Sequence, residues 1–253
     1  MFSPTSLGCG CCQTSYRVSG NVPVFAEPET VSDDALGSIN FRKRYEWQYQ
    51  DASSASAYDQ SFRASARKRQ RTRRELAIVE TLLGDQQKTG RLLDIPCGGG
   101  RLSDPISDAC DELIEADIAP AQLALALKRH DQSGISTRVE GVVASALNIP
   151  LANESVDGVI CARLSHHLPD STERRALLAE LLRVARFFVI FSFTDLASIQ
   201  SLSRKLRGKS LNPSAMSQDE IERIVTSEGA HIKQFMTVSN IGPRHRFVLL
   251  EKV

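Results

Sequence analysis

The ten residues from Leu92 to Arg101 restrict the fold of this chain more than any other segment. They read LLDIPCGGGR, so an apolar strand ends in Asp94, a glycine-rich turn follows, and an amphipathic segment of helical length comes next. Glycine lets a backbone turn sharply and approach a ligand closely, because no Cβ stands in the way. A glycine cluster alone more often marks an ordinary loop. Placed between a strand and a helix, however, this one predicts a nucleotide-binding turn.

Short apolar runs alternate with amphipathic segments of helical length from Arg91 onward, which is typical of a parallel sheet covered by helices on both faces. The predicted strands are 91–95, 112–117, 137–143, 157–162 and 187–193. The predicted helices between them are 101–110, 120–130 and 171–184. A capping box at Ser217–Glu220 starts a further helix to about residue 228, and strands over 231–239 and 244–251 can pair as a hairpin. Ligands of such sheets bind beyond the carboxyl ends of the strands.

Charge and cysteine usage exclude several classes of protein. The 31 Lys and Arg nearly balance the 30 Asp and Glu, which favours neither a nucleic-acid binder nor a membrane-surface protein. The longest apolar run, 187–191, is too short to cross a bilayer. The first residues lack a basic region followed by a long apolar stretch, and the six cysteines do not have the spacing of a disulfide framework. We therefore expect a protein of the reducing cytoplasm without a transmembrane helix.

A second acid strengthens the nucleotide interpretation. Asp117 ends the next predicted strand, seventeen residues after Gly100, and an acid in that place can accept both hydroxyls of a ribose. A nicotinamide-dependent enzyme offers the same two signals. These residues alone leave both classes of enzyme open.

Three later segments separate the two classes. ASALNIPL (144–151), NESVDGVI (153–160) and LSHHL (164–168) resemble, in order and spacing, successive motifs of the class I S-adenosylmethionine-dependent methyltransferases. The resemblance runs from about residue 60 to the end of the sequence and is strongest to the group that includes the ubiquinone and menaquinone biosynthesis methyltransferases. It implies a Rossmann-like, seven-stranded α/β sheet, mostly parallel, with an antiparallel C-terminal hairpin and helices on both faces. It also implies S-adenosyl-L-methionine as the cofactor.

The same resemblance implies roles for individual residues. The methionine end of the cofactor would be lined by Asp94, Pro96, Cys97, Gly98 and Gly100. The ribose would lie at Asp117 and Ile118, the adenine beside Ser145 and Ala146, and Arg163 would pair with the cofactor carboxylate or an acidic substrate group, unless it is a solvated arginine.

This sequence departs from the family in two places. Most relatives carry an aspartate where Ser145 stands. The serine hydroxyl is shorter and neutral, so it is expected to weaken cofactor binding. Relatives commonly carry Pro-Gly-Gly before the fifth strand, whereas here 183–187 runs almost directly into it. The second departure shortens a loop away from the cofactor.

Methyl transfer asks little of catalytic side chains, because a sulfonium methyl is already electrophilic and the protein mainly aligns the acceptor and excludes water. His166 or His167, after the fourth strand, can act as a base, although the alternative is that they pack this strand against the next helix. Cys97 and Cys161 are expected to be small buried residues. Methyltransferases that act on the amino groups of adenine or cytosine carry a tetrad of Asn or Asp, Pro, Pro and an aromatic residue after the fourth strand. Here the segment 162–165 reads ARLS, so methylation of base amino groups is disfavoured.

The amino-terminal residues 1–26 are predicted to form a unit of their own. Residues 7–25 resemble the second half of the zinc ribbon that precedes many bacterial methyltransferases, with Cys9 and Cys12 as its Cys-x-x-Cys. A structural zinc needs four ligands, so we expect a vestigial ribbon that keeps its hairpin and lacks the metal, unless Cys11 or a second subunit completes a site. A linker over 27–40 and a methyltransferase domain over 41–253 follow, with two cap helices in 41–83 that are interrupted near 51–56.

A basic stretch keeps alternative functions open. Residues 63–74 carry seven positive charges, which can meet RNA, an anionic lipid or a phosphorylated glycan, or can be a solvated helix face. Our first hypothesis is methyl transfer to a small-molecule or lipid-linked acceptor, with the cap and the 195–216 connection closing over it. The alternatives are a catalytically silent scaffold that binds partners and an RNA methyltransferase guided by the basic stretch. The sequence does not select an acceptor or an oligomeric state.

Overall fold

The structure is a computed structural model that describes residues 6–8, 15–19, 21–25, 52–62, 64–86, 89–134, 136–197, 206–208, 210, 212–238 and 245–253. Its strands are β1 Ser6–Gly8, β2 Ser15–Ser19, β3 Val22–Val24, β4 Thr89–Asp94, β5 Cys110–Asp117, β6 Arg138–Val143, β7 Val156–Cys161, β8 Ala185–Thr194, β9 Ala230–Thr237 and β10 His245–Lys252. Its helices are α2 Ala52–Ser61, α3 Ala66–Gly84, α4 Ser103–Asp108, α5 Pro120–Ser133, the 3-10 turn η2 Ser165–His167, α6 Ser171–Val184 and α8 Gln218–Ser227.

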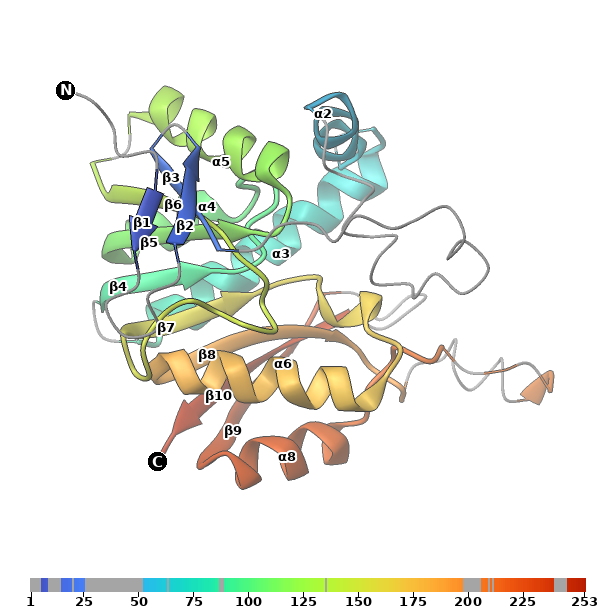
Figure 1. Ribbon diagram of the computed structural model, residues 1–253. Helices are drawn as coiled ribbons and strands as arrows, with labels where there is room; N and C mark the ends of the chain where they lie inside the picture. Colours follow the sequence, from blue (N-terminus) through green and yellow to red (C-terminus); the bar gives the residue numbers. More distant parts are fainter. Residues whose placement is uncertain are drawn as a thin grey trace, which may run out of the picture.

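The described strands form one sheet in the order β1-β2-β3-β6-β5-β4-β7-β8-β10-β9 (Figure 1). β6, β5, β4, β7 and β8 are parallel, and β10 pairs antiparallel with both β8 and β9. The chain runs outward in opposite directions from β4, which pairs with β5 on one side and β7 on the other. A crevice opens at such a switch point. The predicted Rossmann-like sheet with its antiparallel hairpin is confirmed.

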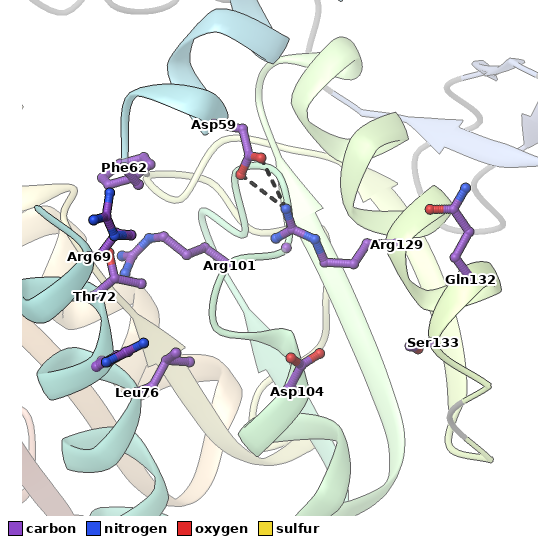
Figure 2. Close-up of a pocket in the computed structure, with 12 residues that line it drawn as sticks. Asp59, Phe62, Arg69, Thr72, Leu76, Arg101, Asp104, Arg129, Gln132 and Ser133 are labelled. Atoms are coloured by element: carbon purple, nitrogen blue, oxygen red, sulfur yellow. Dashed lines mark hydrogen bonds and ion pairs between the residues drawn. The ribbon is translucent and has the colours of Figure 1, made fainter. Parts of the chain in front are cut away.

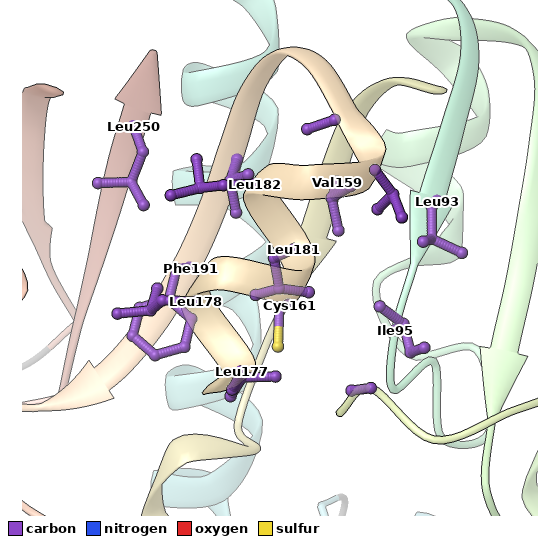
Figure 3. Close-up of a cluster of buried hydrophobic side chains, with 14 of the residues drawn as sticks. Leu93, Ile95, Val159, Cys161, Leu177, Leu178, Leu181, Leu182, Phe191 and Leu250 are labelled. Carbon is purple, nitrogen blue, oxygen red and sulfur yellow. The ribbon is translucent and has the colours of Figure 1, made fainter. Parts of the chain in front are cut away.

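Helices cover both faces of this sheet. α3 and α4 pack on one face through a cluster that includes Val79 and Ile106, and α6 and α8 pack on the opposite face. Figure 3 shows how Leu177, Leu178, Leu181 and Leu182 of α6 reach the sheet residues of this second cluster. These leucines recur at helical spacing, so one stripe of α6 is buried. The carboxyl-terminal halves of β4, β5 and β7 are buried on both faces, as expected for parallel strands covered by helices.

The described sheet is wider than the predicted seven strands because amino-terminal strands join its edge. The predicted hairpin is present as β2 and β3, and β1 pairs antiparallel with β2. β3 lies parallel to β6 through Val24 and Val143, and the N–H of Phe25 donates to the carbonyl oxygen of Val143 at 2.9 Å. An exposed edge strand presents unpaired backbone groups, which this addition covers on β6. Cys9, Cys11, Cys12 and the predicted linker 27–40 lie outside the described residues.

The break between the cap helices was predicted in the wrong place. Residues 52–61 are helical, and the described residues 62, 64 and 65 lie outside the helices, whereas the break was predicted near 51–56. Ser65 is the N-cap of α3, and its side chain accepts from the N–H of Lys68 at 3.3 Å. Serine is favoured at an N-cap because its oxygen satisfies a free backbone donor. Ala55 is fully buried, so packing and the helix propensity of alanine hold the serine-rich stretch helical.

Other boundaries differ by a few residues. α4 is limited to Ser103–Asp108, shorter than the predicted 101–110, because the glycine turn extends to its first residues and β5 already starts at Cys110. β8 starts at Ala185, directly after the last residue of α6, so the connection expected to be short has no turn residues at all.

Candidate functional site

The site lies at the carboxyl ends of β4, β5 and β7, where the glycine turn leaves β4. Gly98 and Gly100 have φ angles of +55° and +70°, in the left-handed region that favours glycine. A Cβ at Gly100 would lie 2.9 Å from Ser103 Oγ and 3.0 Å from the Cα of Ala126 in α5. The turn therefore packs against the backbone of α5 at a distance that no other residue allows.

Asp117 connects the glycine turn to the end of β5, the two features from which the sequence predicts a nucleotide site. Its Oδ2 accepts from the N–H of Gly98 at 2.9 Å, and its Oδ1 accepts from the N–H of Ala119 at 2.8 Å. Burial raises the pKa of Asp117 to about 6, although the N–H groups of Ala119 and Gly98 oppose this rise. The end of β5 is thus tied to the glycine turn by one carboxylate, which is ionised at neutral pH.

Asp94 lies at the end of β4 and is almost completely buried, with 1% of its surface exposed. Its Oδ1 has no hydrogen-bond partner within the described residues. Burial and the nearby Glu115 raise the pKa of Asp94 well above its usual value. A buried polar atom without a partner is costly, so this oxygen is a candidate acceptor for a ligand donor.

A mostly apolar hollow lies beside the turn on the β6 side. Its lining residues are Ile95, Pro96, Ile118, Ala144, Ser145, Ala146, Leu147, Leu164, His167 and Leu168. We call it the adenine-side hollow, since the resemblance placed the adenine at Ser145 and Ala146. The Oγ of Ser145 accepts from the N–H of Leu147 at 3.3 Å, so the hydroxyl that replaces the family's aspartate is engaged by its own loop.

A second hollow, which we call the methionine-side hollow, meets the first at Pro96. It brings together Asp94, Cys97, Gly98 and Arg163 with residues that the sequence did not single out, whereas Gly100 lines a neighbouring hollow instead. These additional residues are Tyr58, Asp59 and Phe62 from the α2 segment, and Gly99, Arg101, Leu102 and Ala162. α2 therefore covers the part of the site where the methionine end of a cofactor is expected.

Three arginines around this hollow share one buried carboxylate. Glu75 of α3 is 0% exposed, and its oxygens lie 2.6 Å from Arg101 Nη1, 2.9 Å from Arg163 Nη1 and 3.1 Å from Arg71 Nε. Burial alone would raise the pKa of Glu75, but Arg101 and Arg163 bring it below its usual value. The alternative that Arg163 is a solvated arginine is wrong, because its side chain is 19% exposed and paired.

The ring of Phe62 lies against the same arginines. The guanidinium carbons of Arg101 and Arg163 are 4.8 Å and 5.1 Å from the ring centroid. Cations at this distance from an aromatic face are attracted to it. Phe62 therefore links α2 to the arginine side chains of the methionine-side hollow.

His166 and His167 lie in η2, with ring centroids 3.9 Å apart, and His245 of β10 is 6.4 Å from His166. Burial lowers the pKa values of His166, His167 and His245 to about 2, 4 and 3. All three rings are therefore neutral at pH 7. His167 lines the adenine-side hollow.

The described cysteines are free and buried, as expected, and burial raises the pKa values of Cys97 and Cys161. No group of three or more His, Cys, Asp or Glu side chains could hold a metal ion within the described ranges. Among the helices that the structure describes, none has the length and apolar character needed to cross a membrane.

Residues 92–186 match the family model described as a methyltransferase domain. Over this stretch the chain is similar to a methyltransferase domain. It is 37% identical over 93 residues to the ubiquinone biosynthesis O-methyltransferase of Cereibacter sphaeroides, which covers 37% of each protein. The match to the enzyme of the same name from Ruegeria pomeroyi is 38% over 80 residues, or 32% of each protein. The chain thus matches about a third of the length of these relatives.

Solved structures show the same fold around the methyltransferase domain. The magnesium protoporphyrin IX methyltransferase of Synechocystis, with bound SAH, aligns with a TM-score of 0.67 at 16% identity, over 84% of this chain and 100% of that one. A SAM-dependent methyltransferase from Aquifex aeolicus aligns with a TM-score of 0.55 at 19% identity, over 80% and 99%. The family-model match over residues 92–186 favours the methyltransferase class over the nicotinamide-dependent alternative.

Proposed function

We propose that this protein transfers a methyl group from S-adenosylmethionine to a small-molecule or lipid-linked acceptor. The observation that carries the proposal is the carboxylate of Asp117, which accepts from the N–H of Gly98 in the lining of the methionine-side hollow; this hollow meets the adenine-side hollow at Pro96. The matched relatives are named for ubiquinone biosynthesis and for magnesium protoporphyrin IX, which supports a small-molecule acceptor.

The residues of the site fit the parts of this cofactor. The apolar adenine-side hollow suits a flat base, and the oxygens of Asp117 suit ribose hydroxyls. Arg101 and Arg163 suit the methionine carboxylate, since guanidinium groups bind carboxylates strongly. The unpartnered Oδ1 of Asp94 suits the ammonium group. Gly100 allows the turn to stay closed against α5 without a side chain in the way.

The bound cofactor supplies an electrophilic methyl group, and the chain supplies position and protection. α2 covers the methionine-side hollow through Tyr58 and Phe62, which excludes water from the sulfonium. His167 is the candidate proton acceptor for a hydroxyl or amine, because its lowered pKa keeps the ring neutral above about pH 4. His166 lies directly behind it. A base with such a low pKa is weak, so alignment of the acceptor provides most of the rate.

Calorimetric titration with S-adenosylmethionine at pH 7.5 tests the cofactor site. Asp117→Ala removes the ribose acceptor and is expected to weaken binding roughly 100-fold, the loss of two charge-assisted hydrogen bonds. His167→Ala is expected to weaken it less than about threefold, because the neutral ring lines the adenine-side hollow and makes no charged contact with the cofactor. Asp131→Ala on the exposed side of α5 is the matched control for a lost carboxylate. Comparable losses in the Asp117 and His167 variants, or no saturable heat in the wild type, would contradict the proposal.

The RNA alternative gains no support from the basic helix. Arg71 is paired with Glu75, and Arg74 Nη1 donates to the carbonyl oxygen of Val238 at 3.4 Å. These side chains stabilise the fold, and Arg63 lies outside the described residues. No structural observation favours the silent scaffold over the enzyme.

We also propose a cytoplasmic location, supported by the free thiols of Cys97, Cys110 and Cys161. The domain organisation that we propose is a ribbon-like hairpin in 1–26, a linker in 27–40 and a methyltransferase domain in 41–253 that includes the cap. The hairpin of β2 and β3 supports the first part of this division, and the pairing of β3 with β6 attaches it to the methyltransferase sheet.

A further inference from the structure

A trench of about 550 Å³ lies between α3 and α5, with α2 above it and the start of α4 below it (Figure 2). It is separate from both hollows of the cofactor site over most of its length. Asp59, Phe62 and Arg101, however, line both the trench and the methionine-side hollow. A molecule in the trench can therefore extend toward the place where the methyl group is transferred.

Two helices present polar stripes to this trench. The α3 wall consists of Arg69, Thr72, Arg73 and Leu76, which follow one another at helical spacing and so share one face. Figure 2 shows Arg69, Thr72 and Leu76 along this wall and Arg129, Gln132 and Ser133 along the α5 wall opposite. A stripe that faced a packed core would be apolar. Both walls are instead suited to a polar ligand.

Positive charge dominates the lining. Arg69, Arg73, Arg101 and Arg129 face only two carboxylates within the trench, those of Asp59 and Asp104. Arg101 is held by Glu75 from below, and Arg129 Nη2 lies 3.1 Å from both oxygens of Asp59. Within the part of the chain that the structure describes, no hydrogen bond or ion pair engages Arg73. The trench therefore has cationic groups that an anion can bind.

Apolar surface lies next to these charges. Phe62 contributes to the rim on the α2 side, and Leu76 lies one turn below Arg73 on α3. An inorganic ion would leave this surface in water, whereas an organic anion would cover it. The ligand that fits the lining has an acidic group and an apolar or aromatic body.

We propose that the trench binds the acidic end, a carboxylate or a phosphate, of the methyl acceptor, with the apolar body against Phe62 and Leu76. This inference rests on the proposed methyltransferase function and specifies its substrate class. Arg73 and Arg129 bind the acidic group, and the neutral end of the acceptor points toward the methionine-side hollow.

Asp59 competes with the ligand for the same cation. Its carboxylate already occupies Arg129, so an incoming anion has to displace it or share the guanidinium. Replacing Asp59 by asparagine keeps the shape of the side chain and removes the competing charge. Asp59→Asn is thus expected to strengthen anion binding and Arg73→Ala to weaken it. A general loss of structure cannot produce these opposite effects.

The test uses calorimetric titration of the full chain with 1-naphthoate, an aromatic carboxylate, and with its neutral counterpart 1-naphthamide. We expect saturable binding of naphthoate and at least tenfold weaker binding of the amide. Arg73→Ala is expected to weaken naphthoate binding about tenfold, the loss of one charge-assisted hydrogen bond, and Asp59→Asn to strengthen it several-fold. Arg67→Ala, an exposed position of α3 outside the trench, is the matched control and is expected to leave binding within twofold.

A second arm with 1-naphthyl phosphate distinguishes the two sources of negative charge, because the tighter of the two probes identifies the acidic group. Equal losses in Arg67→Ala and Arg73→Ala, or equal binding of naphthoate and naphthamide, overturn the proposal. So does tight binding of a 20-residue uridine oligonucleotide that naphthoate fails to displace, because that result assigns the arginines to RNA.

A titration with S-adenosylhomocysteine in the same samples separates this inference from the proposed function. Cofactor binding without naphthoate binding overturns the trench alone. Naphthoate binding without cofactor binding overturns the methyltransferase function and, with it, the assignment of the trench ligand as a methyl acceptor.

Discussion

Gly100 carries a constraint that the left-handed backbone alone does not explain. Gly134, at the end of α5, has a similar φ of +67°, but a Cβ there would meet nothing within 4 Å. At Gly100 the added Cβ would collide with the backbone of Ala126. The two glycines therefore separate the effect of conformation from the effect of close packing.

The expected outcome is a clear difference between Gly134→Ala and Gly100→Ala. The first is expected to cost about 1–2 kcal/mol of unfolding free energy, the penalty of a left-handed alanine. The second is expected to cost at least about 2 kcal/mol more, because strain and overpacking add to that penalty, and to abolish S-adenosylmethionine binding. Urea unfolding of the three proteins measures this difference, and equal costs would show that α5 yields to the side chain.

The pKa of Asp117, raised to about 6, predicts a pH dependence of cofactor affinity. Below pH 6 the free site holds a proton on Asp117, which removes an acceptor for the ribose, so affinity is expected to fall about tenfold between pH 7 and 5. The neighbouring histidines do not contribute, because their pKa values lie at about 4 or lower. Titration calorimetry across this range tests the sign, and an affinity that rises on acidification would contradict it. Asp117→Asn is expected to remove the part of the dependence that Asp117 causes, and the raised pKa of Asp94 accounts for what is left.

Residues whose role depends on local backbone were predictable, and those that depend on distant contacts were not. The sequence alone predicts a turn at Gly98 and Gly100 and the end of a strand at Asp117. Phe62 joins the site only because α2 folds over the sheet, and nothing in its neighbours indicates that. Glu75 left a weak signal, since an acid occupies the first place of the apolar stripe that continues with Ile78, Val79 and Leu82.

At the scale of elements, α2 is the described part of the cap that lines the methionine-side hollow, through Tyr58 and Asp59. It is attached by the ion pair of Asp59 with Arg129 and by the ring of Phe62 over Arg101 and Arg163. α2 itself is otherwise weakly apolar, with Ala55 as its buried residue. Its position therefore depends on a few polar and aromatic contacts.

Phe62→Ala is expected to speed dissociation of S-adenosylhomocysteine by roughly tenfold, because each lost cation–π contact is worth about 0.5–2 kcal/mol. Phe187→Ala is the matched control, since this ring lies 5.7 Å from the guanidinium carbon of Arg186 at the far end of β8 and is 55% exposed. Stopped-flow displacement measures both rates. A similar change in the two variants would remove α2 from the control of access.

The sheet elements were predicted well because each strand is a short apolar run with a fixed place in the βα alternation. The cap helices were placed less well, since a serine-rich stretch is ambiguous until it is known that Ala55 is buried. The attachment of β3 to β6 was missed because it depends on one long-range pairing, Val24 with Val143. Patterns in sequence report burial, and edge pairing leaves little trace in them.

At the scale of the whole molecule, three histidines make the folded state sensitive to acid, one of them buried and two half-buried. The pKa values of His166, His167 and His245 are lowered on folding, so the unfolded chain binds more protons between pH 6.5 and 4. The stabilisation is fully present above pH 6.5 and is lost as the pH falls toward the folded values. Asp117 acts in the opposite direction over part of this range, because its pKa is raised.

His245→Gln isolates one of these contributions. Relative to wild type, the variant is expected to lose about 2 kcal/mol less unfolding free energy between pH 7.5 and 5, since one proton fewer is taken up on unfolding. His231→Gln, at an exposed position on β9, is the matched control. Urea denaturation at the two pH values gives the comparison. Parallel curves for His245→Gln and wild type would mean that this ring accepts a proton without unfolding.

The carboxylate of Glu75 has a consequence for the turnover cycle of the proposed enzyme. Guanidinium groups that bind an anionic ligand repel one another after it dissociates. The side chains then move apart, or water enters the cleft. Here an internal counterion stays in place, so Arg101 and Arg163 keep their neutralising partner before and after each round. Product exchange then requires no rearrangement of these charged side chains, and the ligand-free protein already has the conformation that binds the next S-adenosylmethionine.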